Sequence, residues 1–156
     1  MKKMILAAPM LALHMFAGGV GALEIDDNAR TVASNDAGDT VTISMQAYLK
    51  GKKLFSYACA SCHVQGRTAT HPNVGLDLET LALAVPPRNT MQGSVDFLKA
   101  PRSFDGEDDI SEEHPGVNSA DIFPEMRNFT EDDLHAIAAY LLIQPKISKT
   151  WGGGYR

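Results

Sequence analysis

Apolar positions recur at helical spacing in two long segments of the chain, and the first of them predicts a helix that begins at Met45. Ser44 is well suited to cap its start. The residues that recur at this spacing are Tyr48, Leu49, Lys52 and Phe55. Gly51 lies among them, although a glycine costs a helix roughly 1 kcal/mol relative to alanine. We therefore expect a second helix to approach closely at Gly51.

The second long helical pattern lies near the end of the chain, in the stretch TEDDLHAIAAYLL that begins at Thr130. Acidic residues fill its first turn, where they favour the positive end of the helix dipole. Its apolar stripe consists of Leu134, Ile137, Ala138 and Leu141. Pro145 is expected to end this helix. If the first and last helices cross, they close a small all-α domain.

Shorter elements are predicted between and before these two helices. The stretch LDLETLALAVPP indicates a brief helix stopped by its prolines, and MQGSVDFLKAP indicates another that ends before Pro101. Near the start, β-branched residues flank the turn sequence SNDAGD, which predicts a two-stranded hairpin outside the helical core. The expected organisation is a hairpin over 24–44, a helical core over 45–145 and a tail over 146–156.

The first residues have the pattern of a secretory signal. A basic start precedes an apolar run over residues 4–20, and the small residues 20–22 would suit a signal peptidase. The run is too short for a stable membrane span. We therefore predict that residues 1–22 are a cleaved signal peptide and that the mature protein begins near Leu23. Residues 23–156 then form a single domain.

Charge narrows the choice of partners. The full chain carries a net charge of −5, and loss of Lys2 and Lys3 with the signal removes two positive charges and no negative one, which leaves −7. Such an acidic protein is poorly suited to nucleic acid, because binding to phosphates needs clustered Lys and Arg. Proteins with basic patches are better matched partners.

The main chemical signal is the stretch LFSYACASCHVQG, which contains Cys59, Cys62 and His63. These are the only two cysteines, and a disulfide across so short a loop would gain little. Cys-x-x-Cys-His is instead the signature of covalent c-type haem attachment. Thioethers from both cysteines would hold the porphyrin, and the imidazole of His63 would bind the iron as proximal ligand.

Three alternatives to haem attachment fit the sequence less well. A thioredoxin-like redox pair needs a βαβ context, and none precedes the motif. A zinc site needs a fourth ligand and usually a second Cys or His pair. A chance match is disfavoured because the motif follows a secretory signal and an amphipathic helix.

The second axial ligand is left open by the residue pattern. The remaining histidines and methionines of the mature chain are His71, His114, His135, Met45, Met91 and Met126. Met45 and Met91 are interpreted as packing residues, and His71 and His135 as exposed. His114 and Met126 share the stretch HPGVNSADIFPEMRNF, whose apolar residues can line a haem. Spacing alone does not choose between these two.

Acidic residues lead directly to His114. They are Asp105, Glu107, Asp108, Asp109, Glu112 and Glu113. We interpret them as a solvated loop. If His114 binds iron, their negative field would also favour the ferric state and lower the reduction potential, subject to screening by salt.

The chain resembles the extrinsic low-potential cytochrome c of photosystem II, the cytochrome c-550 family. The resemblance lies in LFSYACASCHVQG, LALAVPPRNTMQGSVDFLKAP, HPGVNSADIFPEMRNFTEDDL and the WGGG after the last helix. It implies a small class I-like cytochrome c domain around one covalent haem c. It also implies two histidines on the iron, the second in the HPGVNSADIFP motif, which corresponds to His114 here. Met126 is then the alternative that the resemblance disfavours.

The resemblance further implies a place and a role. Members of this family bind the core and the other extrinsic subunits on the lumenal face of photosystem II. There they stabilise the oxygen-evolving manganese–calcium cluster and its retention of calcium and chloride, and they bind no manganese themselves. The implied location is the thylakoid lumen of a cyanobacterium or an algal plastid, with membrane association through protein alone. The ending WGGGYR is shorter than the family's tail.

Three functional classes compete. A haem enzyme needs an open iron position, which two histidine ligands would fill, so an enzyme is not expected. A soluble electron-transfer cytochrome c of the lumen or periplasm needs only an exposed haem edge, and the residues alone favour it. The family motifs favour the photosystem subunit.

Overall fold

The computed structural model describes residues 24–153. The predicted signal peptide, the expected new N-terminus at Leu23 and the last residues of the predicted tail lie outside this range. The helices and strands in chain order are α1 (Asp27–Arg30), β1 (Thr31–Ala33), β2 (Thr40–Thr42), α2 (Met45–Ala58), α3 (Leu78–Leu83), α4 (Met91–Lys99) and α5 (Glu131–Ile147). Short 3-10 helices lie at Val64–Gly66, Val117–Ser119, Pro124–Met126 and Trp151–Gly153. The all-α prediction is confirmed.

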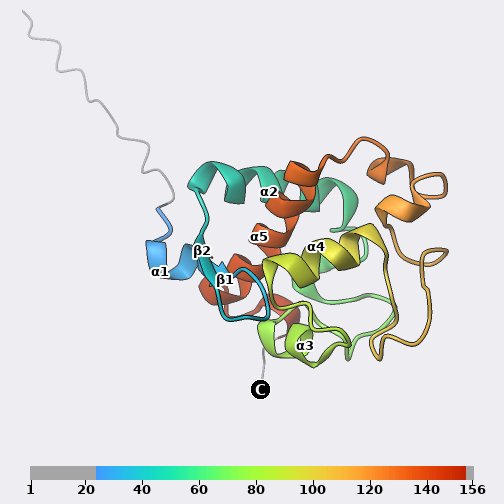
Figure 1. Cartoon of the computed structure of the whole chain (residues 1–156), viewed down its shortest axis with the longest axis horizontal. Helices are drawn as coiled ribbons and strands as arrows, with labels where there is room; N and C mark the ends of the chain where they lie inside the picture. Colours follow the sequence, from blue (N-terminus) through green and yellow to red (C-terminus); the bar gives the residue numbers. More distant parts are fainter. Residues whose placement is uncertain (1–23, 154–156) are drawn as a thin grey trace, which may run out of the picture.

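The last helix lies at the centre of the domain, where α2 and α4 both pack on it (Figure 1). The contact with α2 is closest at Gly51, where a Cβ would lie 1.8 Å from the backbone oxygen of Ala136. The prediction of a close helix approach at Gly51 is therefore confirmed. Aromatic rings fill the space beside this crossing, since Tyr140 lies 5.6 Å from Tyr48 and 5.1 Å from Phe55 between ring centres.

The buried face of α2 differs from the predicted repeat at two of its four residues. The helix begins at Met45 as expected, and the Ser44 side chain accepts a hydrogen bond from the N–H of Ala47. Its buried residues are Tyr48, Gly51, Phe55 and Ala58. Leu49 and Lys52 are exposed, because they lie on the face turned away from α5. The glycine, which has no side chain to signal burial, marks the centre of the contact.

Helix α5 is buried around most of its circumference rather than along one stripe. The four predicted stripe residues are buried, and so are Ala136, Ala139, Tyr140, Leu142 and Ile143. Thr130 and Asp133 form a capping box at its start. Pro145 does not end the helix, which continues to Ile147, so that prediction was wrong. A proline within the last turn removes only one N–H and leaves the final turn intact.

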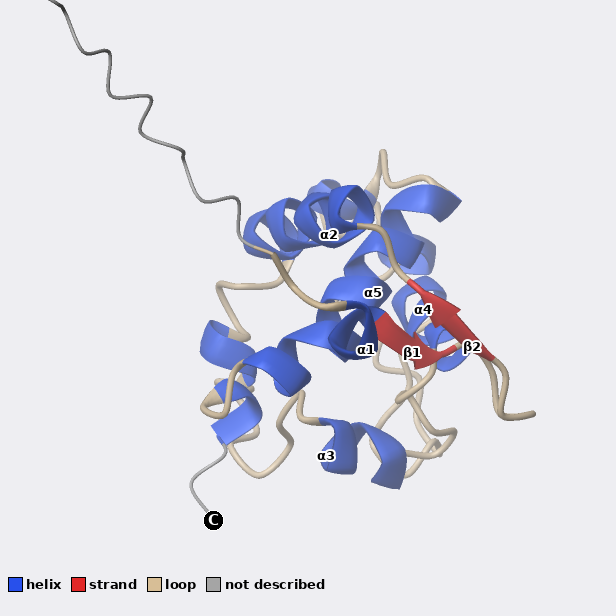
Figure 2. Ribbon diagram, turned by 90° about the vertical axis from the view of Figure 1, so that its left-hand side faces the viewer, coloured by secondary structure: helices blue, strands red, loops and turns tan. Residues whose placement is uncertain are grey.

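The N-terminal hairpin is confirmed, with Thr31 paired to Thr42 and Ala33 to Thr40 in antiparallel register. It does not lie outside the core as expected. Val32 is 3% exposed and Ile43 8% exposed, and both belong to the central hydrophobic cluster. The hairpin lies beside α5 (Figure 2). Near the end of α5, the ammonium of Lys146 donates to the backbone oxygen of Thr31. The short helix α1 was not predicted.

The two short helices between the long ones were predicted correctly in place and in end. Asp77 caps α3 by accepting from the N–H of Thr80 at 2.9 Å, and Thr90 caps α4 by accepting from Gly93 at 3.0 Å. Pro86 and Pro87 follow α3, and Pro101 follows α4. Within residues 24–153, none of the helices combines the length and the apolar composition that crossing a membrane requires.

The segment after α5 returns to the core. Trp151 is buried and its indole N–H donates to the backbone oxygen of Leu76 at 2.9 Å. Gly66 lies against the same indole, where a Cβ would come within 2.6 Å of it. The end of the described chain thus packs against the loop that follows the Cys-x-x-Cys-His motif.

Candidate functional site

The two cysteines and His63 follow directly on the last turn of α2. Cys59 caps the helix, and its N–H donates to the backbone oxygen of Phe55 at 2.9 Å. The N–H groups of Cys62 and His63 both donate to the backbone oxygen of Cys59, at 3.2 and 2.9 Å. One carbonyl at the end of a long, packed helix therefore fixes the backbone of the whole motif.

The imidazole of His63 is oriented by Thr68. The hydroxyl of Thr68 donates its hydrogen to the backbone oxygen of Val74, so its oxygen is left to accept from Nδ1–H of His63 at 3.3 Å. With its proton on Nδ1, the ring keeps a lone pair on Nε2. Histidine ligands of metals are commonly held by such a second hydrogen bond.

The imidazole of His114 is also oriented by a hydrogen bond at Nδ1. Its backbone N–H donates to the oxygen of Ile110 at 2.8 Å, and its Nδ1 lies 3.0 Å from the backbone oxygen of Pro115. Since a carbonyl oxygen can only accept, Nδ1 carries the proton here as well. Nε2 of His114 is again the nitrogen with the free lone pair.

The rings of His63 and His114 lie opposite each other, with centroids 6.0 Å apart and planes inclined by 54°. A metal–imidazole nitrogen bond is about 2 Å, and each ring centre lies roughly 1 Å behind its bonding nitrogen, so two imidazoles on one metal have centroids about 6 Å apart. The observed separation therefore fits a single iron between the two rings.

Burial keeps both imidazoles neutral. It lowers the pKa of His63, and it lowers the pKa of His114 to about 4, with the neighbouring His63 contributing in the same direction. A neutral imidazole is the form that binds a metal. Both groups are thus in the required state at neutral pH.

The far side of His114 is covered by an aromatic ring. Phe97, on α4, meets the imidazole edge to face with centroids 4.9 Å apart. The guanidinium of Arg88 lies over the ring of Phe97, with its Cζ 4.0 Å from the ring centre. Arg88, Phe97, His114 and His63 therefore follow one another as a continuous set of contacts.

The cysteine thiols are both free. Burial, aided by the charge of Glu125, raises the pKa of Cys59 to about 12. A redox-active Cys-x-x-Cys pair needs a thiol whose pKa is lowered instead, because the thiolate is the reactive form. The burial of Cys59, which raises the pKa of its thiol, thus disfavours the thioredoxin-like alternative. Within residues 24–153, His, Cys, Asp and Glu form no cluster of three or more that could hold a metal ion.

The other candidate ligands lie elsewhere. Met126 is 2% exposed and belongs to the hydrophobic cluster, with Met45 packed against that cluster and Met91 within it. His71 and His135 are exposed, as expected. The structure thus brings His114 to His63.

Sequence reasoning missed Thr68, Phe97 and Arg88. Thr68 carried a signal that was available, since a hydroxyl residue shortly after a haem-type histidine is a natural partner for its second nitrogen. Phe97 looked like an ordinary apolar residue of a short helix. Arg88 follows two prolines and gave no sign that it would be 9% exposed.

The acidic residues before His114 form a loop ordered by backbone contacts. Arg102 donates to the backbone oxygens of Gly106 and Glu107, at 3.0 and 2.8 Å from Nη2. Hydrogen bonds from Ser103 and Glu107 lower the pKa of Asp105, which stays ionised. The loop is solvated, as expected, since all six of its acidic residues are exposed.

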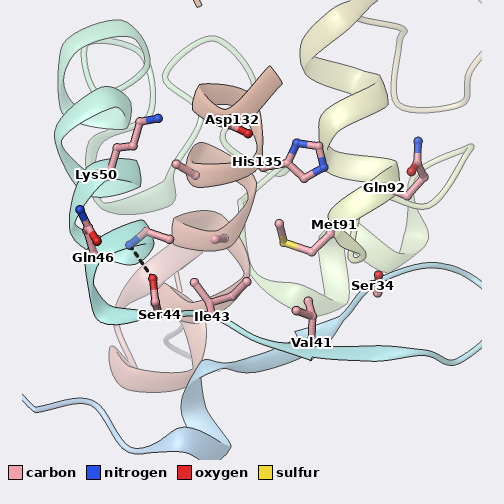
Figure 3. Close-up of a pocket in the computed structure, with 13 residues that line it drawn as sticks. Ser34, Val41, Ile43, Ser44, Gln46, Lys50, Met91, Gln92, Asp132 and His135 are labelled. Carbon is pink, nitrogen blue, oxygen red and sulfur yellow. Dashed lines mark hydrogen bonds between the residues drawn. The ribbon is translucent and has the colours of Figure 1, made fainter. Parts of the chain in front are cut away.

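A separate cavity of about 510 Å³ lies between the hairpin, α2, α4 and α5 (Figure 3). Ile43, Met91 and Ala136 are among its apolar lining residues, and His135 and Lys50 are among its polar ones. Its lining includes neither of the two cysteines and neither His63 nor His114. This cavity is therefore distinct from the site described above.

The helical fold and a Cys-x-x-Cys-His motif beside an opposed pair of histidines define a c-type cytochrome. The family model for the cytochrome c-550 domain matches residues 23–156, and the chain belongs to this family. Covalent c-type haem is accordingly its cofactor.

Similar proteins agree with this assignment. Photosystem II extrinsic protein V of Synechococcus elongatus is 54% identical over 149 residues, which cover 94% of this chain and 89% of that protein. The protein of the same name from Trichormus variabilis is 51% identical over 151 residues, covering 96% and 93%. The crystal structure of cytochrome c549 matches with a TM-score of 0.80 and 46% identity, covering 82% of this chain and all of that one.

Proposed function

We propose that this protein is an extrinsic subunit of photosystem II, bound on the lumenal face of the thylakoid membrane. The observation that carries the proposal is the similarity over nearly the whole chain to proteins named Photosystem II extrinsic protein V. Its task is to stabilise the oxygen-evolving manganese–calcium cluster and the retention of calcium and chloride. Its partners are the lumenal domains of the core and the other extrinsic subunits.

Within this proposal Cys59 and Cys62 hold the haem through thioethers, and His63 and His114 are its axial ligands. The haem supplies a one-electron couple between ferric and ferrous iron. The ring separation, the neutral imidazoles and the two Nδ1–H hydrogen bonds support this assignment. The apolar side chains of Val64, directly after His63, and of Val117 and Ile122, in the segment after His114, are exposed and offer surface for a porphyrin to cover.

The same ligand set argues against an enzyme. Two histidines fill both axial positions, so no position is left for a substrate or for dioxygen. We therefore propose a structural and redox role rather than a catalytic one.

The test is to remove and restore the protein on photosystem II membranes. A wash in concentrated salt is expected to release it, because the protein is acidic and screened charges bind weakly. Oxygen evolution should then require added calcium and chloride, and rebinding of the purified haem protein should restore it without them. Unchanged oxygen evolution after complete release would favour the soluble electron carrier instead.

A further inference from the structure

Arg88 is an unusually placed charge for a domain of this size. It is 9% exposed, and its guanidinium lies over the face of Phe97 at 4.0 Å from the ring centre. Burial lowers the pKa of Arg88 to about 10, which leaves the group protonated at neutral pH. A buried arginine over an aromatic face is a stronger contact than an exposed one, because neither partner is competing with water.

Hydrogen bonds to the backbone hold the guanidinium in place. Its Nη2 donates to the backbone oxygens of Arg102 and Ser103, at 2.9 and 2.6 Å. The backbone of Arg88 is also tied to the neighbouring helices, since its N–H donates to Leu81 and its oxygen accepts from the hydroxyl of Ser94 at 2.6 Å. These hydrogen bonds restrain the planar guanidinium over the phenyl ring.

Arg102 and Ser103, whose backbone oxygens bind Arg88, lie at the start of the loop that leads to His114. The backbone oxygen of Pro101 accepts from Ile110 at 3.2 Å, and the oxygen of Ile110 accepts from His114 at 2.8 Å. Arg88 therefore reaches His114 by two routes. One passes through the ring of Phe97 to the imidazole, and the other through the loop backbone to the same residue.

We propose that Arg88 and Phe97 are positioning residues that fix the plane of the His114 imidazole through the guanidinium–phenyl–imidazole set of contacts. The inference rests on the proposed role of His114 as an iron ligand. Rotation of an axial imidazole changes the splitting of the iron d orbitals, so the electron paramagnetic resonance of the ferric protein reports the ring plane directly. A ring that is less firmly held also leaves the iron more readily.

The experiment uses the haem-loaded full protein and compares R88M, R88K, F97L and F97Y with the unmodified chain. R88M and R88K should both shift or broaden the low-spin ferric signal, because lysine keeps the charge but lacks the planar fork. F97L should do the same, and F97Y should not, since tyrosine keeps the ring. Cyanide should displace His114 on the order of tenfold faster in R88M and F97L, equivalent to about 1.4 kcal/mol.

The matched control is R127M. Arg127 also donates to backbone oxygens, those of Ala120 and Asp121, at 2.9 and 3.2 Å, but it does not stack on Phe97. The low-spin ferric signal of R127M should equal that of the unmodified protein. Ferric signals unchanged in both R88M and F97L would overturn the inference. An R88K signal equal to that of the unmodified protein would overturn it too, because the effect of Arg88 would then be one of charge alone. If R88M does not fold, the contrast between F97L and F97Y still decides.

Failure of the proposed ligand set is distinguishable from failure of this inference. Without two imidazoles on the iron, the unmodified protein itself would lack a bis-imidazole low-spin signal. In that case the axial assignment and the inference fall together. An unmodified protein with that signal, but with variants that do not change it, overturns the inference alone.

Discussion

The backbone oxygen of Ala136 occupies the space in which a side chain at Gly51 would begin. The distance from an ideal Cβ at Gly51 to that oxygen is 1.8 Å, and to the Cβ of Tyr140 it is 3.0 Å. Backbone atoms in the middle of a helix cannot give way as the end of a flexible side chain can. The crossing of α2 and α5 therefore depends on a missing side chain, and the motif at the end of α2 depends on that crossing for its position.

Gly51→Ala is predicted to destabilise the domain although alanine is the better helix former. Forcing α2 and α5 apart should cost about 2 kcal/mol, as for other overpacked cores, which outweighs the gain of about 1 kcal/mol in helix propensity. The thermal midpoint of the haem-loaded protein should fall by several degrees. Lys53→Ala, at an exposed position of the same helix, is the matched control and should leave the midpoint almost unchanged.

Sequence reasoning recovered the parts of the fold that depend on local chemistry. Ser44 was predicted as a helix cap because its hydroxyl directly precedes the helical pattern, and the structure confirms it. The start of the last helix at Thr130 was also predicted from local sequence. The errors came from tertiary contacts. Leu49 was included in the helical repeat because it is apolar, yet it is exposed and the glycine two positions later lies at the helix contact. The hairpin was placed outside the core because nothing local shows that Val32 and Ile43 pack against α5.

In the candidate site, too, the residues set by local sequence could be predicted, and those set by tertiary contacts could not. The motif of Cys59, Cys62 and His63 is local, so its residues could be named from the sequence. The choice between His114 and Met126 depends on which one folds against His63, and only the family resemblance favoured His114. Arg88 and Phe97 were missed because their role lies in contacts between α4, its preceding loop and a distant segment.

The stability of the domain should fall at acidic pH in a manner that depends on Asp133. Its hydrogen bonds with Lys50, at 2.8 Å, and with Thr130 lower its pKa to about 2. A carboxylate whose folded pKa is depressed contributes stability above its unfolded pKa, near 4, and loses that contribution as pH falls towards 2. Chemical denaturation between pH 7 and pH 2 measures the effect.

Asp133→Asn is the variant that isolates the stability contributed by the Asp133 carboxylate. It should cost about 1 kcal/mol at pH 7, as loss of a helix cap does, and the difference from the unmodified protein should vanish near pH 2. Asp132→Asn, one residue earlier in the same turn and outside the capping box, serves as the control and should differ little at either pH. A cost at Asp133 that stayed constant with pH would contradict the assigned cause.

The Trp151 indole should stabilise the loop that follows the haem motif. Its N–H donates to Leu76, and its ring lies where Gly66 has no side chain. Trp151→Phe removes the hydrogen bond and should cost about 1 kcal/mol, while Trp151→Leu also opens a cavity and should cost about 3 kcal/mol. Denaturant midpoints give the free energies. Equal costs for the two substitutions would show that the ring contributes no packing.

Replacing His114 by methionine should raise the reduction potential by on the order of 100 mV, because thioether sulfur favours ferrous iron more than imidazole does. The ferric protein should gain the weak far-red band of sulfur-to-iron charge transfer, which the unmodified protein should lack. Met126→Leu is the matched control, since Met126 lies in the hydrophobic cluster 2% exposed and should affect neither quantity. Potentiometric titration followed by absorption measures both. A far-red band in the unmodified protein that disappears in Met126→Leu would instead assign the second axial position to Met126, and the hydrogen bond between His114 and Pro115 would then have no part in holding the iron.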